Sequence, residues 1–211
     1  MADSADDRLL ALLGLRLKGF AAAAGVGEVV GLNEDATAAA LDALVADGLV
    51  NYNEARDVYL LNPATGRPEG ERILGAQLDA AGARSAVQAV YDEFLGLNMS
   101  MLKLCTDWQI RADGDGKTLN DHSDEDYDQD VIGRLVDLDD DLRKILTKLR
   151  GLLERYGAYV PRFRGALDRL LSGEIEYFTK PIIPSYHTVW FELHEDLLAT
   201  LGIDRASEGS I

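Results

Sequence analysis

Apolar side chains recur at helical spacing through most of residues 83–201, and this periodicity limits what the second half of the chain can fold into. Between residues 126 and 156, leucine, valine and isoleucine fall three and four positions apart, which makes one face of an amphipathic helix. The helices expected on this basis cover residues 83–104, 126–138, 139–156, 162–172 and 186–201. Ser185 is the expected N-cap of the last helix. Together these patterns predict an all-helical bundle.

The N-terminal part of the chain predicts three further helices. A leucine-rich stretch favours a helix over 6–24, and a short helix is expected near 28–32. A third helix is expected over 34–46, because Asn33 stands at the N-cap position and Gly48 where a left-handed residue ends a helix.

Two strand-like runs, 49–53 and 57–61, follow the third helix and flank a polar turn, so they predict a β-hairpin. The stretch LDALVADGLVNYN, residues 41–53, resembles the end of the recognition helix and the first wing strand of winged-helix proteins. This resemblance covers about residues 6–66. The expected fold class is mainly α: a winged helix of three helices plus a β-hairpin, followed by an all-helical bundle.

A shift in composition near residue 90 predicts two domains. Only Phe20, Tyr52 and Tyr59 represent the aromatic residues before it, whereas both tryptophans and all three histidines follow it. The expected parts are a winged-helix domain at 1–67, a connector helix at 68–90, a bundle domain at 91–203 and a flexible tail at 204–211.

Composition excludes several classes of protein. The chain has 21 Lys plus Arg and 37 Asp plus Glu, a net charge of −16, and its 47% of hydrophobic residues excludes global disorder. A single cysteine, Cys105, excludes a disulfide or a cysteine-based zinc site within the chain and fits a reducing compartment. No apolar run is long enough to span a membrane, and the acidic start MADSADDR does not match a secretory leader. We therefore expect a cytoplasmic protein that is not bound to membranes.

The predicted recognition helix argues against DNA binding. Segment 34–47 carries no lysine or arginine, and it has four carboxylates, from Glu34, Asp35, Asp42 and Asp47. Phosphate contacts need cations, and strong base contacts come from Arg, Lys, Asn or Gln. Thr37 is the one candidate base-reading side chain. DNA is thus not an expected partner, and the winged helix is expected to contact protein instead.

The segment 105–128 has the densest potential chemistry and lies between two predicted helices. Two interpretations of it stay open. In the first it is a ligand site, in which His122 acts as a base oriented by Asp121 or Asp124, and Arg111 holds an anion. Trp108, Gln109, Asn120 and Asp121 are the candidate substrate-binding residues of this site. In the second it is a structural connection, in which Trp108 anchors the loop and Ser123 or Asp124 caps the next helix.

The remaining histidines, carboxylates and the cysteine give less evidence of a functional site. His187 and His194 share one face of the last helix with Trp190, and all three are candidate substrate-binding residues. No metal site is expected, because a calcium loop beginning at Asp124 would need glycine and glutamate where the chain has Gln129 and Leu135. Cys105 is expected to be buried, and no Walker, GxSxG or GxGxxG motif is present.

Three stretches of the second half are similar to parts of small bacterial proteins that accompany enzymes of the pyruvate phosphate dikinase and phosphoenolpyruvate synthase type. These stretches are CTDWQIR (105–111), NDHSDEDYD (120–128) and SYHTVWFELHEDLL (185–198). The resemblance implies that a dikinase-like partner subunit supplies ATP, Mg²⁺ and a phosphohistidine. This chain would then bind no cofactor itself and would supply an acceptor site containing Trp108, Gln109, Arg111, Asn120, Asp121 and His122.

Our leading hypothesis is therefore a substrate-binding or accessory subunit of an ATP-dependent phosphotransferase that acts on a small hydroxylated compound, such as a phenol, in aromatic catabolism. The alternative is a ligand-responsive transcription regulator whose helical domain senses a small molecule and forms a homodimer. A scaffold without a pocket is the third interpretation.

The purified chain is expected not to bind duplex DNA specifically, because helix 34–47 lacks cations. The measurement is a mobility shift with the DNA upstream of its own gene at roughly 0.1 M salt. Nanomolar, sequence-dependent binding would contradict the expectation and favour the regulator.

Overall fold

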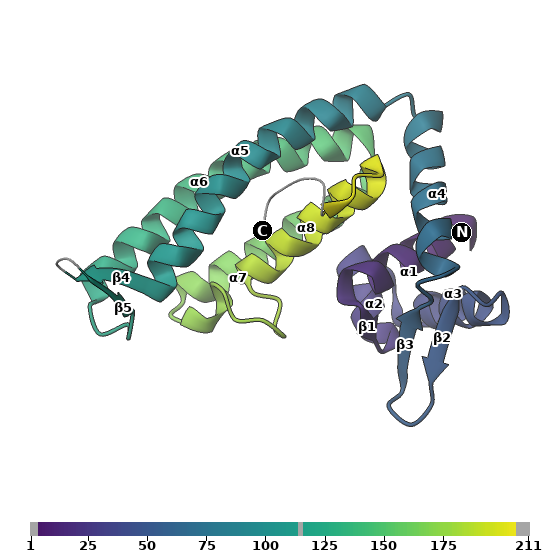
Figure 1. The fold of residues 1–211 in the computed structure, drawn as a ribbon, viewed down its shortest axis with the longest axis horizontal. Coiled ribbons are helices and arrows are strands. Elements are labelled where there is room, and N and C mark those ends of the chain that lie inside the picture. The colour runs from purple at the N-terminus through teal and green to yellow at the C-terminus, as the bar shows by residue number, and fades with distance from the viewer. Residues whose placement is uncertain (1–3, 114–115, 206–211) are drawn as a thin grey trace. The chain divides into compact units, whose positions relative to one another are not determined.

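The computed structural model describes residues 4–113 and 116–205, which form a mainly helical protein (Figure 1). Most of the tail expected at 204–211 lies outside the described residues. The chain divides into two compact units, one of Met1–Ser85 with Phe191–Ile211 and one of Ala86–Trp190. None of the described helices combines the length and the apolar character that a bilayer-spanning segment needs.

The first unit combines helices with a small antiparallel sheet. Its elements are α1 (Ser4–Lys18), β1 (Phe20–Ala21), α2 (Ala23–Val30), α3 (Glu34–Ala46), β2 (Val50–Asn53), β3 (Val58–Leu61) and α4 (Gly66–Ala80). The strands lie in the order β1-β3-β2, with Phe20 opposite Leu60 and Tyr52 opposite Tyr59. Buried leucines of α1 and α3 form the centre of its core.

The structure confirms the predicted N-cap, the predicted left-handed glycine and the predicted hairpin of this unit. Asn33 caps α3, because its side-chain oxygen accepts a hydrogen bond of 2.9 Å from the N–H of Ala36. Gly48 follows with a φ of 72°, and strands β2 and β3 form the predicted hairpin.

The helix expected over 6–24 is confirmed as far as Lys18 and is wrong beyond it. Helix α1 ends at Lys18, because Gly19 has a left-handed φ of 74° and Phe20–Ala21 then pairs with β3. The short helix expected at 28–32 is replaced by α2, which already starts at Ala23. Pairing with a distant strand thus overrides the helix propensity of Ala21, whereas Ala23 and Ala24 are helical as part of α2.

The segment 68–90, expected as one connector helix, contains parts of two helices. Helix α4 ends at Ala80 and α5 (Arg84–Gln109) begins after a turn in which Gly82 has a φ of 60°.

The second unit contains most of α5 and the elements that follow it. These are β4 (Ile110–Asp113), β5 (Gly116–Leu119), α6 (Glu125–Leu152), the 3₁₀ turns Glu154–Ala158 and Ile175–Tyr177, α7 (Tyr159–Leu171) and the start of α8 (Tyr186–Leu201). Helices α5 and α6 run antiparallel (Figure 1). Lys148 bridges to Glu93 at 2.6 Å near one end, and Arg134 bridges to Asp107 at 2.7 Å near the other.

The long helix α6 corrects the prediction of two helices at 126–138 and 139–156. Leu138 and Leu142 are both buried and continue one apolar face, and no proline or glycine separates them. The last helix is confirmed: α8 starts at Tyr186, and the Ser185 hydroxyl accepts a hydrogen bond of 3.2 Å from the N–H of Thr188.

The end of α8 belongs to the first unit. Arg16 of α1, with a side chain only 9% exposed, pairs with Glu71 of α4 and, at 3.0 Å, with Glu195 of α8. Ala199 packs in a cluster with Leu13 and Leu74. Residues 191–205 therefore complete the core of the first unit.

Two glycines of α4 differ in the space around them, so replacing each by alanine should have opposite effects on stability. At Gly66 an added Cβ would lie 2.0 Å from the carbonyl oxygen of Leu49, whereas at Gly75 it would meet nothing closer than 3.7 Å. Gly66→Ala should therefore lower the free energy of unfolding by about 2 kcal/mol, and Gly75→Ala should raise it by about 0.5–1 kcal/mol. Urea denaturation followed by circular dichroism measures both, and equal effects of the two substitutions would contradict the close approach.

Candidate functional site

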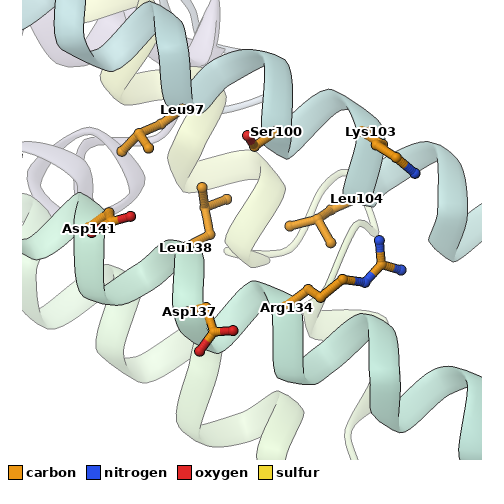
Figure 2. A pocket seen from close by; sticks show the side chains of 8 residues that line it. All are labelled: Leu97, Ser100, Lys103, Leu104, Arg134, Asp137, Leu138 and Asp141. Carbon is orange, nitrogen blue, oxygen red and sulfur yellow. The ribbon is translucent and has the colours of Figure 1, made fainter.

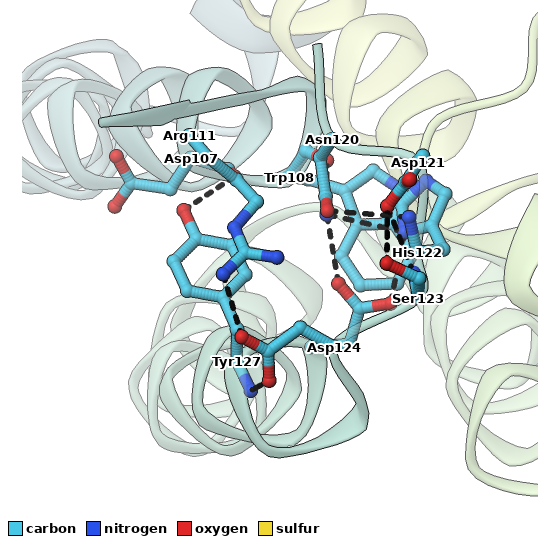
Figure 3. Close-up of polar contacts among 10 residues, drawn as sticks. Asp107, Trp108, Arg111, Asn120, Asp121, His122, Ser123, Asp124 and Tyr127 are labelled. Atoms are coloured by element: carbon cyan, nitrogen blue, oxygen red, sulfur yellow. Dashed lines mark hydrogen bonds and ion pairs between the residues drawn. The ribbon is translucent and has the colours of Figure 1, made fainter. Parts of the chain in front are cut away.

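A compact polar cluster joins the end of α5 to the start of α6 (Figure 3). Trp108 lies in the last turn of α5, because that helix continues to Gln109, beyond the end expected at 104. Its indole is 3% exposed and packs against the ring of His122, with centroids 4.5 Å apart, and against Phe178 at 4.6 Å. Trp108 is thus a packed wall of the cluster and anchors the connection.

Asn120 holds the cluster together. Its buried side-chain amide donates to the carbonyl oxygen of Trp108 at 3.1 Å and to Oδ1 of Asp128 at 2.8 Å. One amide has two hydrogens, so these two bonds use both of them. Asn120 thereby fastens the last turn of α5 to the first turn of α6.

His122 is oriented by its neighbours. Its Nδ1 lies 2.9 Å from Oδ2 of Asp128 and 3.2 Å from the amide nitrogen of Asn120. Since Asn120 already uses both hydrogens, the assignment that satisfies every group has Nδ1–H donating to Asp128. The lone pair is then on Nε2, for which no hydrogen bond is found among the residues the structure describes.

The backbone of His122 is also unusual. Its φ is 60°, in the left-handed region, and its N–H donates to the side-chain oxygen of Asn120 at 3.2 Å. Residues in this conformation concentrate at functional sites, where surrounding contacts maintain the strain. The side chain is 27% exposed, so part of it is open to solvent.

Arg111, predicted to hold an anion, is already occupied. Its Nη2 lies 2.6 Å from Oδ2 of Asp124, and its guanidinium stacks 4.6 Å from the ring centroid of Tyr127. The N–H of Tyr127 and the charge of Arg111 hold the pKa of Asp124 below its usual range. An anionic ligand would therefore have to replace Asp124 as the partner of this arginine.

Two other predicted residues lie at the edge of the cluster. Gln109 is exposed at the end of α5. Asp121 is exposed, and its carboxylate accepts hydrogen bonds from the N–H and hydroxyl of Ser123, which lower its pKa. Asp128, and not Asp121 or Asp124, is the carboxylate that contacts His122.

The predicted residues of α8 occupy separate positions. Trp190 is buried and donates from Nε1 to Asn98 at 2.9 Å. The backbone N–H of His187 donates to the carbonyl of Phe178, whose ring packs on Trp108. Burial lowers the pKa of His187, and burial with the charge of Arg205 lowers the pKa of His194 to about 4, so both are neutral at pH 7. His194 belongs to the first unit.

A cavity of about 310 Å³ lies between α5 and α6 (Figure 2). Its lining residues are Leu97, Ser100, Lys103, Leu104, Arg134, Asp137, Leu138 and Asp141. Lys103 and Arg134 each contact the carboxylate of Asp107 at 2.7 Å. Burial alone would raise the pKa of Asp107, but these hydrogen bonds lower it below its usual range.

Asp107 contacts two residues of that cavity and also neighbours the His122 cluster. Asp107 precedes Trp108, and its carbonyl oxygen accepts a hydrogen bond of 2.8 Å from the hydroxyl of Tyr127.

Four residues of these two sites, Asp128, Phe178, Lys103 and Arg134, were not predicted from the sequence. Asp128 lies in an acidic run that the sequence analysis interprets as a solvated surface. Its position could have distinguished it, since it lies one helical turn after the cap residue Asp124, within the first turn of α6.

Cys105 is buried, as predicted, and burial raises the pKa of its thiol to about 12. The thiol is therefore protonated at neutral pH and is a poor nucleophile. Within residues 4–113 and 116–205, no group of three or more His, Cys, Asp or Glu side chains is arranged to hold a metal ion.

Comparisons with known proteins return no relatives. No family model matches the chain, and neither a curated protein nor a solved structure matches it.

Replacing Asn120 by alanine should destabilise the second unit, because the carbonyl of Trp108 and the carboxylate of Asp128 would both lose a buried donor. The expected loss in free energy of unfolding is about 1–3 kcal/mol. Gln109→Ala, which removes an exposed amide from the same segment, should change it by less than about 0.5 kcal/mol. Urea denaturation compares the two, and equal small losses would contradict the proposed role of Asn120.

Proposed function

We propose that the second unit is the acceptor-binding part of an accessory subunit of a phosphohistidine-type phosphotransferase. The observation that carries this proposal is the geometry of His122, with Nδ1 held by Asp128 at 2.9 Å, the ring packed on Trp108, and Nε2 left for a ligand. A carboxylate that fixes the tautomer and stabilises the imidazolium is the usual support of a histidine general base.

In the proposed reaction, Nε2 of His122 takes the proton of an acceptor hydroxyl while that oxygen attacks the phosphorus of the partner's phosphohistidine. An O–P bond forms and the P–N bond breaks. The released imidazole of the partner takes up a proton, and His122 returns its own proton to solvent. The partner supplies the ATP and Mg²⁺ chemistry, and this chain supplies the base and the acceptor-binding surface.

Two cations near this end of α5 support a phosphoryl group as part of the ligand. Arg111 is paired with Asp124 and Arg134 with Asp107, and their side chains are 28% and 37% exposed. Ion pairs this close to solvent contribute only about 0–1 kcal/mol, so a phosphoryl oxygen can replace either carboxylate at small cost. We place this chemistry in the cytoplasm, where the single cysteine stays reduced.

We further propose that residues 4–61 form a winged helix that contacts protein. The element order from α1 to β3 and the strand order β1-β3-β2 support the winged helix. Glu34, Asp35, Asp42 and Asp47 are all exposed on or just after α3. Thr37 is fully buried and its hydroxyl donates to the carbonyl of Asn33 at 2.7 Å, so it is not available to read bases. These features favour a basic protein surface over DNA, which makes the transcription regulator the weaker alternative.

The test is phosphotransfer in a mixture of this chain, a dikinase-type enzyme from the same genome, labelled ATP and a panel of phenols. We expect label in a phenol only when both proteins are present. His122→Gln should lower the rate by about 10²–10⁴-fold, the usual contribution of a general base. Lys144→Gln, which changes an exposed side chain of α6 outside the His122 cluster, should leave the rate unchanged.

Circular dichroism of each variant shows whether it is folded. Full activity of a folded His122→Gln variant would place the base elsewhere. Transfer by the enzyme alone, or no transfer to any phenol with the wild-type pair, would overturn the subunit assignment.

A further inference from the structure

A second cavity, of about 330 Å³, lies between α6 and α7 in the second unit. Its lining residues are Asp139, Arg143, Leu146, Val160, Phe163, Arg164 and Asp168. It shares none of them with the His122 cluster or with the α5–α6 cavity. A ligand bound in this second cavity would therefore be independent of the proposed phosphotransferase.

The wall of this cavity contains a buried charge. The side chain of Asp139 is 2% exposed, and its Oδ1 accepts a hydrogen bond of 2.9 Å from the hydroxyl of Tyr186, which is itself fully buried. Its Oδ2 lies 2.7 Å from Nη2 of Arg143. Removing a carboxylate from water is unfavourable unless partners compensate, and here two partners hold it in place.

The rim carries groups of both signs. Arg143 and Arg164 have side chains that are 58% and 77% exposed. Arg143 is held by Asp139 and offers the outer edge of its guanidinium, whereas Arg164 can turn toward a ligand. Asp168 is 65% exposed, and its Oδ2 is 3.6 Å from Nε of Arg164, too far for a hydrogen bond. Two cations and two carboxylates give the lining a formal net charge of zero.

The remaining wall is apolar. Phe163 and Leu146 are buried, and Val160 is 42% exposed at the cavity's edge. An aromatic ring and two aliphatic side chains can cover an apolar group of a ligand. The cavity volume is near the lower limit for small-molecule sites, which suits a compound the size of one amino acid.

We propose that this cavity binds a zwitterionic α-amino acid with an apolar or aromatic side chain. The ligand's carboxylate pairs with Arg164 and the outer edge of Arg143, its ammonium group pairs with Asp168, and its side chain lies against Phe163 and Leu146. Asp139 is a positioning residue, because it holds the Arg143 guanidinium at the rim. The side chains that line the cavity have a formal net charge of zero. A ligand with a net charge would leave one charged rim group unpaired, so the cavity disfavours such ligands.

Isothermal titration with four compounds tests the class of ligand. L-Phenylalanine and L-leucine should bind and saturate, whereas phenethylamine and 3-phenylpropionate, which each lack one charge, should bind at least about tenfold more weakly. In NMR spectra, the methyl signals of Val160 and Leu146 should shift with L-phenylalanine, which places the ligand in this cavity.

Variants on the rim test the assigned contacts. Arg164→Gln and Asp168→Asn should each weaken L-phenylalanine binding by at least about fivefold. Arg169→Gln removes an exposed arginine of α7 that lies outside the cavity lining and should leave binding unchanged. All three positions are exposed, so circular dichroism should show folded variants.

Several outcomes would overturn the proposal. Equal binding of 3-phenylpropionate would make this an anion site, and equal binding of phenethylamine would make it a cation site. No saturation by either amino acid up to about 10 mM would show that the buried Asp139–Tyr186 pair only joins α6 to α8.

Discussion

The side-chain amide of Asn120 is the constraint on which the candidate site depends. By donating to Trp108 and to Asp128, it fixes the end of one long helix against the beginning of the next. This bond pattern leaves Nδ1 of His122 with Asp128 as its acceptor, and the oxygen of the same side chain holds the left-handed backbone at that histidine. The arrangement of the imidazole, the carboxylate and the indole in this cluster thus depends on one amide.

Much of the fold could be predicted because its signals are local. Asn33, Gly48 and Ser185 mark helix ends through the hydrogen bonds or dihedral angles that they allow, and the leucines mark the helices of the bundle. The break after Lys18 could not be predicted in the same way, since Phe20–Ala21 becomes a strand only by pairing with the distant residues Tyr59 and Leu60. The single helix α6 was missed because its acidic run suggested a boundary that nothing in its apolar face supports.

The candidate site was partly predictable from the sequence. Trp108, Asn120 and His122 lie close enough along the chain to be grouped, and the structure brings them into contact. Asp128 and Asp139 could not be separated from the other carboxylates of α6, because which of them turn inward depends on partners such as Asn120 and Tyr186. In an acidic chain, charge alone does not distinguish a carboxylate that orients another side chain from one that only faces solvent.

Helix α8 has a consequence for how the protein is made. Its first residues belong to the second unit, and its last residues supply Glu195 to Arg16 and Ala199 to the core of the first. During synthesis, helices α1 to α4 therefore leave the ribosome well before the segment that covers them, and they expose an apolar surface with a nearly buried arginine until it emerges. Most of the core of the first unit is translated early, but its last part is added late, so a chaperone has time to act on the incomplete core.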